Sequence, residues 1–170
     1  MMKKTKRYIA LIVLCLLMLI AAAALGESVM IGTTEMSFSV PLVLQPEELP
    51  ADAVDAGVRY AAQNADGSLR FVLIVKAMKR GGDMDISALI ARAEAHENVT
   101  VEESVTADGA EFVISSETLR SNGEDVIFRM ATATAHGKQL MLFFIDQAGN
   151  YPDITKEMVS SITFREEVQP

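Results

Sequence analysis

Cysteine is nearly absent from this chain, which contains one in 170 residues. Cys15 lies in the middle of an apolar N-terminal run and follows Leu14. A lipidated cysteine would follow a small residue at the end of such a run, so we do not expect Cys15 to be lipidated. The rest of the chain therefore has no disulfide, although many small exported domains depend on them. The stability of the domain must come from its core. The roughly 144 residues beyond position 26 are enough for one.

Positive charge is also scarce, with 15 basic against 23 acidic residues and a formal net charge of −8. Four of the basic residues lie within the first seven positions. Without them the chain has 11 basic and 23 acidic residues, a net charge of −12. Such a domain repels nucleic acid and anionic membrane surfaces, so we expect neither as a partner. The acids are scattered, which excludes a disordered acidic tail.

The N-terminus has the three parts of a secretory signal. A basic head precedes the uncharged run Tyr8–Leu25, which ends in the small residues Ala21–Ala24. Cleavage after Gly26 or after Ala24 fits the small-residue rule, and we favour Gly26 because Glu27 begins the polar stretch. This predicts a signal peptide over 1–26 and a single domain over 27–170. Alternatively, the 18 uncharged residues are retained as an anchor, since that length is near the minimum for spanning a bilayer.

Either outcome places the domain outside the cytoplasm, because the basic residues hold the N-terminus inside. We expect a secreted or extracytoplasmic protein, associated with the cell surface if the segment is retained. A membrane is expected as a partner only through the uncleaved segment.

The pattern beyond position 35 predicts a mainly antiparallel sheet. Met36–Val40 alternates like a half-buried strand and stops at Pro41, and residues 45–57 read as a surface loop with one helical turn. Short turns rich in Asp-Gly and Asn-Gly join the later strands, and they are too short for parallel crossovers. The expected strands are 58–63, 69–79, 99–106, 111–119, 125–135 and 138–146.

Several of these strands are apolar on both faces, namely residues 71–75, 126–128 and 140–145. A sheet with one solvated face would alternate instead. Two helices are available as covers. Asp85 caps an expected helix with the apolar stripe Ile86, Leu89, Ile90 and Ala93, and a second begins at Pro152 with the stripe Ile154, Met158 and Ile162. One helix on each face predicts an α/β fold of the α+β type, a three-layer α/β/α sandwich.

This order of elements resembles the PsbP-like family. The first strand reads MSFSVP, and a long hairpin, a helix, a meander and a terminal helix ending in SSITF follow it. The resemblance covers roughly residues 36–165 and consists of a pattern of elements. It implies an antiparallel sheet between helices and a binding or assembly role, since members act in photosystem assembly and in binding a small GTPase. It carries over no ligand-contacting residue.

Catalytic candidates are few. His96 closes the first expected helix, where a polar or cationic side chain suits the helix dipole. His136 precedes Gly137 in a tight turn, where we expect it to be exposed. No cysteine follows position 15 and no G-x-S-x-G motif surrounds a serine, so we predict no catalytic residue.

Metal and cofactor sites are not expected either. Asp83-Met84-Asp85 resembles the start of a calcium loop, but the sixth position is Ala88 instead of glycine, and helix capping explains both acids. Arg80-Gly81-Gly82 lacks a phosphate-loop motif. The methionines beyond position 26 are dispersed, and we expect most of them to fill the core.

The sequence favours a non-enzymatic extracytoplasmic module that binds an unknown protein or small molecule. One alternative is a membrane-anchored structural or assembly domain of the cell envelope. Another is an enzyme with a dispersed carboxylate site, because paired acids that are distant in sequence leave no motif.

Overall fold

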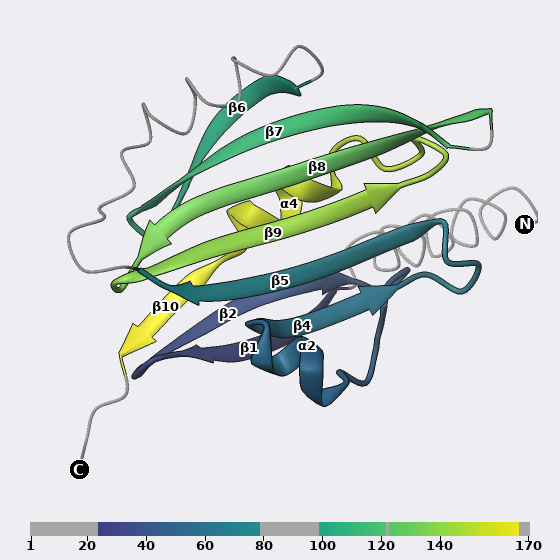
Figure 1. The fold of residues 1–170 in the computed structure, drawn as a ribbon. Coiled ribbons are helices and arrows are strands. Elements are labelled where there is room, and N and C mark those ends of the chain that lie inside the picture. The colour runs from purple at the N-terminus through teal and green to yellow at the C-terminus, as the bar shows by residue number, and fades with distance from the viewer. Residues whose placement is uncertain (1–23, 79–98, 122, 167–170) are drawn as a thin grey trace, which may run out of the picture.

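The computed structural model describes residues 24–78, 99–121 and 123–166, and they form two antiparallel sheets (Figure 1). The larger sheet has seven strands in the order β3-β4-β5-β9-β8-β7-β6, and the smaller has three in the order β1-β2-β10. The larger one comprises β3 (Gln45–Pro46), β4 (Val58–Gln63), β5 (Leu69–Ala77), β6 (Val99–Ala107), β7 (Ala110–Ser121), β8 (Glu124–Ala135) and β9 (Lys138–Asp146). The smaller one comprises β1 (Ala24–Ile31), β2 (Thr34–Pro41) and β10 (Thr163–Glu166).

The three-layer α/β/α sandwich is wrong. The described residues contain two short helices, α2 (Ala51–Asp55) and α4 (Ile154–Ser160), and the second main layer is the three-stranded sheet. Figure 1 shows α4 and the small sheet on the same side of the seven-stranded sheet. The expected helix that begins at Asp85 lies outside the described residues. The antiparallel arrangement of the strands is confirmed.

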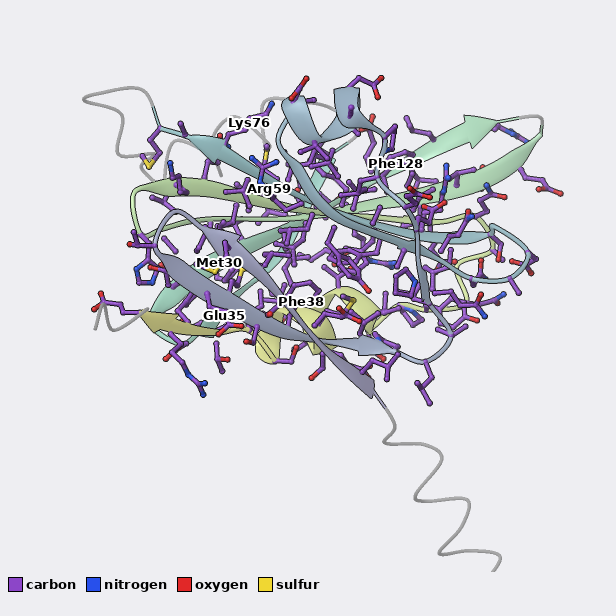
Figure 2. All side chains as sticks on the ribbon, turned by 90° about the horizontal axis from the view of Figure 1, so that it is seen from below. Met30, Glu35, Phe38, Arg59, Lys76 and Phe128 are labelled. Carbon is purple, nitrogen blue, oxygen red and sulfur yellow. The ribbon has the colours of Figure 1, made fainter. Side chains whose placement is uncertain are left out.

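The two sheets enclose the core between them. Strand β2 turns Met36, Phe38 and Val40 toward the large sheet, and each is at most 3% exposed. The Phe38 ring meets that of Tyr60 edge-on at a centroid distance of 5.3 Å. In Figure 2, Phe38 lies in the layer between the sheets, whereas Phe128 lies on the other side of the large sheet. We call the side of the large sheet that faces β2 and α4 its inner face.

Helix α4 covers the part of the inner face that the small sheet leaves open. It packs on β6, β7 and β8 as well as on β2, and it buries Ile154 and Met158 as expected. The helix ends at Ser160, earlier than expected, because the chain turns into β10. Ser161 Oγ accepts the N–H of Ser39 at 2.8 Å and donates to the carbonyl of Met158 at 2.7 Å. Ile162, which is buried, therefore follows the helix instead of continuing its stripe.

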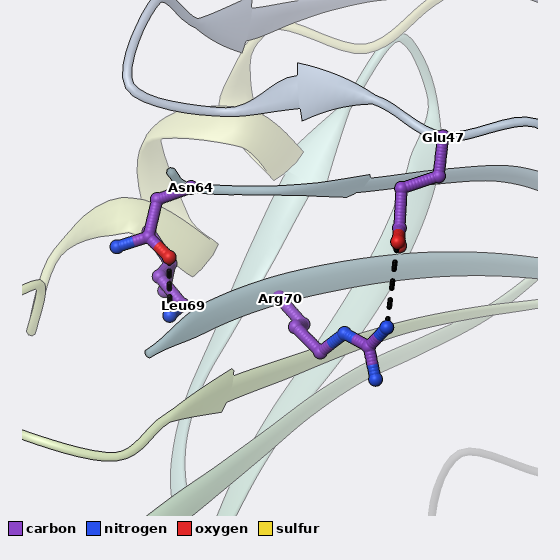
Figure 3. A network of polar contacts seen from close by, with 4 residues as sticks. All are labelled: Glu47, Asn64, Leu69 and Arg70. Carbon is purple, nitrogen blue, oxygen red and sulfur yellow. Dashed lines mark hydrogen bonds and ion pairs between the residues drawn. The ribbon is translucent and has the colours of Figure 1, made fainter. Parts of the chain in front are cut away.

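Polar side chains close the hairpin between β4 and β5 (Figure 3). Asn64 Oδ1 accepts the N–H of Leu69 at 2.9 Å, and this amide is buried. Asp66 accepts the hydroxyl and the N–H of Ser68, and these hydrogen bonds lower the pKa of the Asp66 carboxyl. The nearby Arg70–Glu47 pair, at 3.4 Å, is exposed to solvent and contributes little stability.

Two other hairpins use the turn chemistry that the sequence predicts. Asp108 and Gly109 have φ angles of 44° and 81°, and His136 and Gly137 have 50° and 68°. Two successive left-handed residues are the signature of a two-residue type I′ turn, whose twist matches that of the strands. His136 is an exposed turn residue, as expected, and its ring packs on Phe164 at a centroid distance of 5.0 Å.

Candidate binding surface on the outer face of the large sheet

The outer face of the large sheet is apolar. Strand residues alternate between the two faces, so Phe144 of β9 is in the core at 1% exposure while the adjacent Phe143 is half-buried on the outer face. In the described part of the chain, α4 and the small sheet both pack on the inner face. The apolar residues of the outer face include the exposed Leu119, the buried Val113 and the half-buried Val72, Ile74, Val99, Val101, Val126, Phe128, Met130, Met141, Phe143 and Ile145.

Strand register arranges these side chains in rows that cross the sheet. One row runs Val101, Ser115, Met130, Phe143 and Val72 from β6 to β5. The adjacent row runs Val99, Glu117, Phe128, Ile145 and Arg70. Ser115 is therefore a small residue among larger neighbours, which leaves a hollow in the face.

A cavity of about 220 Å³ lies at this hollow. Ser115 is 7% exposed, and as the smallest side chain of its row it forms the floor. The walls include Phe128 and Met130 of β8 and Phe143 of the neighbouring β9. The remaining lining residues are Val99, Ser116, Glu117 and Arg129. A cavity of this size accommodates an aromatic ring with a short chain, since about 150 Å³ is sufficient for benzene.

Two charged residues contact the cavity, and their side chains lie on different faces of the sheet. Arg129 is opposite Phe144 in register, so its side chain is on the inner face, where the guanidinium is paired with Glu102, with 3.4 Å between Nε and Oε1. Glu117 is half-buried, and among the described residues no hydrogen bond or ion pair reaches its carboxylate. The cavity is thus mostly apolar with one uncompensated negative charge at its wall.

The methionines are distributed differently from the expectation that most are in the core. Of the six in the described residues, Met36 and Met158 are buried in the core, Met130 and Met141 are half-buried on the outer face, Met78 is half-buried and Met30 is exposed. Methionine has an unbranched, polarizable side chain that adapts to different shapes, and it is frequent on binding surfaces. The outer face therefore has the composition of an adaptable surface.

A second cavity, of about 290 Å³, lies at the tips of the two type I′ hairpins. It brings His136 and Asp108 together with Phe164, residues that are distant in the sequence. Asp108 Oδ2 accepts the N–H of Phe164 at 2.6 Å, which ties the turn between β6 and β7 to β10. This explains the aspartate as a structural acceptor. The sequence contains the two turns, but only the fold places them side by side.

A third cavity, also about 290 Å³, lies where β2 ends and α4 begins. Pro41, Val43 and Tyr151 are among its lining residues. Nearby, Leu42 is 51% exposed, and Leu25 of β1, which pairs with Val40, is 48% exposed. Exposed apolar side chains thus gather at the end of the domain where the N-terminal segment joins it.

The other sequence candidates cannot be placed. Residues 80–82, Asp83, Asp85 and His96 lie outside the described residues. Within residues 24–78, 99–121 and 123–166, no group of three or more His, Cys, Asp or Glu side chains could hold a metal ion. In the same ranges, no helix has the length and apolar character needed to cross a bilayer.

No protein-family model and no curated protein sequence matches this chain. Its fold is similar to that of cyanobacterial PsbP (CyanoP) from Synechocystis sp. PCC 6803, with a TM-score of 0.55 and 12% identity over 86% of this chain and 94% of the other. LpqN, involved in cell envelope biogenesis of Mycobacterium tuberculosis, is similar with a TM-score of 0.51 and 14% identity over 85% and 92% of the two chains.

A third similar structure is a Bacteroides thetaiotaomicron protein, with a TM-score of 0.56 and 13% identity. The match covers 79% of this chain but 46% of the other, so this chain spans about half the length of that protein. At such identities the likeness concerns the fold alone. The fold is PsbP-like, as the sequence resemblance implies, while the expected helical cover on both faces is not found in the described residues.

Proposed function

We propose that this protein is an extracytoplasmic, non-enzymatic binding domain that holds its ligand on the outer face of the seven-stranded sheet. The observation that carries the proposal is the apolar cavity above Ser115, over β6 to β9 on the face that α4 and the small sheet do not cover. Concave, mostly apolar hollows of this kind are where small-molecule ligands usually bind. The predicted N-terminal export signal, and a fold similar to that of an envelope-biogenesis protein, support the extracytoplasmic location.

The lining of the cavity favours binding over catalysis. Hydrolysis by dispersed carboxylates needs two acids flanking the substrate, and among the described residues that line this cavity there is one, Glu117. Its other lining residues are apolar side chains, two serines and an arginine that is already paired. These groups can orient a ligand by contact and hydrogen bonding, as in ligand pockets generally.

The test uses toluene, a neutral apolar probe that fits the cavity volume. Toluene added to the purified full chain should shift the ε-methyl NMR signal of Met130 in a saturable way, because this side chain lines the cavity. The substitution Ser115→Leu fills the cavity from its floor and should abolish the saturable shift. Phe128→Ala, which removes a wall, should weaken binding.

Ser104→Leu is the matched control, since Ser104 pairs with Val113 on the outer face but does not line the cavity. It should leave toluene binding unchanged. Folding of each variant is checked by its thermal melt. A Met130 signal that ignores toluene in the unsubstituted protein would refute the proposal, as would equal loss of binding in both leucine variants.

A second candidate is the membrane-anchored envelope domain, and one observation favours it. Strand β1 includes Ala24, Leu25 and Gly26, which pair with Pro41, Val40 and Ser39. The uncharged run Tyr8–Leu25 therefore ends inside a paired strand, with no linker before the domain. A retained anchor would hold the exposed Leu25 and Leu42 at the bilayer surface.

N-terminal sequencing of the protein from the extracellular and membrane fractions separates the two forms. A secreted species that starts at Glu27 supports cleavage, and one that starts at Leu25 supports the other cut. An intact species confined to the membrane fraction supports the anchored domain.

A further inference from the structure

We infer that the ligand of the outer-face cavity is a small molecule that joins a compact apolar group to a positively charged head, as an aryl-alkyl amine does. This inference rests on the proposed function and specifies its ligand. The apolar walls select the body of the ligand, and the carboxylate of Glu117 selects the charge of its head.

The size of the cavity sets the apolar part. A volume of about 220 Å³ is below the range of about 300–1,000 Å³ that is usual for drug-sized ligands. It is somewhat larger than the roughly 150 Å³ that is sufficient for benzene. A phenyl ring with two or three further carbon atoms therefore fills it, and a larger ring system does not.

The register of the strands places the charged part. Glu117 is directly opposite Phe128 on β8 and Val99 on β6, so its carboxylate lies between apolar neighbours on both sides. Those neighbours displace water from a half-buried charge, which raises the benefit of a cationic partner. The described residues supply none, because Arg129, which contacts the cavity, directs its side chain to the inner face and is paired there with Glu102.

The competing charge nearby does not reverse this preference. Arg129 and Glu102 together are neutral, and the chain as a whole is acidic. A ligand with a carboxylate head would meet Glu117 at short range and the net negative field at long range. A ligand with an ammonium head would gain from both, and the gain would fall with ionic strength.

Three probes with the same aromatic body test the inference by titration against the Met130 methyl signal: toluene, 2-phenylethylammonium and 3-phenylpropionate. At low salt the cation should bind about tenfold more tightly than the anion, with toluene between them. The variant Glu117→Gln should bring the two charged probes close to equal affinity while leaving toluene binding unchanged.

Glu111→Gln is the matched control, because it removes one negative charge from the same strand at an exposed position that does not line the cavity. It should preserve most of the preference for the cation. Toluene binding without a cation preference, or a preference that survives Glu117→Gln, would overturn the inference and leave the proposed function standing. Failure of all three probes to bind would overturn both.

Discussion

Substitutions of two adjacent phenylalanines on β9 measure directly how differently the two faces of the large sheet are covered. Phe144 is 1% exposed and stacks on Phe71 with 4.9 Å between the ring centroids. Phe143 is half-buried on the outer face. Both lie on one strand, so the change in strand propensity caused by alanine is the same for each and cancels in the comparison.

The structure sets the two magnitudes apart. Phe144→Ala leaves a closed cavity between the sheets and should cost about 3–5 kcal/mol, the usual range for a core phenylalanine. Phe143→Ala leaves no closed cavity. If roughly half of the ring's area is buried, about 80–100 Å² of apolar surface is lost, which corresponds to about 2 kcal/mol. The difference of about 1–3 kcal/mol should lower the melting temperature of Phe144→Ala by roughly 2–12 °C relative to Phe143→Ala, at about 2–4 °C per kcal/mol for a domain of this size.

Urea denaturation of the two variants and the unsubstituted protein provides the measurement. If Phe144→Ala does not fold, which is plausible for a domain with a total stability of about 5–15 kcal/mol, Phe144→Leu replaces it with a cost of about 1–2 kcal/mol. Equal costs of about 3–5 kcal/mol at both positions would refute the reasoning, because they would show that the outer face is as fully covered as the inner one.

Three further substitutions test features of the core and turns. Burial, and secondarily Glu27, raises the pKa of Tyr60 to about 12, so the folded state resists ionisation of the phenol. Stability is therefore unaffected by this group below about pH 10 and falls as the pH rises from about 10 toward 12. The Tyr60 hydroxyl has no hydrogen-bond partner among the described residues, so Tyr60→Phe should be neutral or stabilising by up to about 1 kcal/mol at pH 7. Between pH 9 and 11.5 the variant should lose less stability than the unsubstituted protein in thermal melts. A large loss of stability at pH 7 would contradict this. Gly57→Ala should cost at least about 1 kcal/mol more than Gly109→Ala. Both glycines have a positive φ, but only at Gly57 would an added Cβ lie 2.8 Å from a backbone oxygen, that of Val75. Equal denaturation midpoints of the two variants would refute the clash. Asn64→Ala should cost about 1–3 kcal/mol by leaving the buried N–H of Leu69 unpaired, and a neutral result in the same assay would show that water replaces the side chain.

Local signals in the sequence determined the meander. The expected bounds of β4 and β9 match the structure, and His136-Gly137 forms the predicted two-residue turn. Turn chemistry and strand alternation act over a few residues, so they can be read without the fold. The same signals predicted one strand before Pro41 but could not show that it belongs to a separate sheet.

Tertiary structure decided the second layer. The first residues of β1 are interpreted from the sequence as the exit of an export segment, and the first residues of the four-residue β10 as the end of a helix, because neither segment has a strand pattern of its own. Each is a strand because it pairs with β2, and that pairing depends on a chain that has already folded back over the core. This is why the sheet took the place where helices were expected.

The candidate site shows the same division between local and long-range information. The alternation of β9 already places Phe143 and Phe144 on opposite faces. In the sequence, however, Ser115 and Glu117 are ordinary strand residues without a motif. They become the floor and wall of a cavity because four strands in register place them beside Phe128 and Phe143. Residue identity alone fixes the face on which a side chain lies, but its neighbours across the sheet depend on pairings between distant segments, and these exist only in the folded chain.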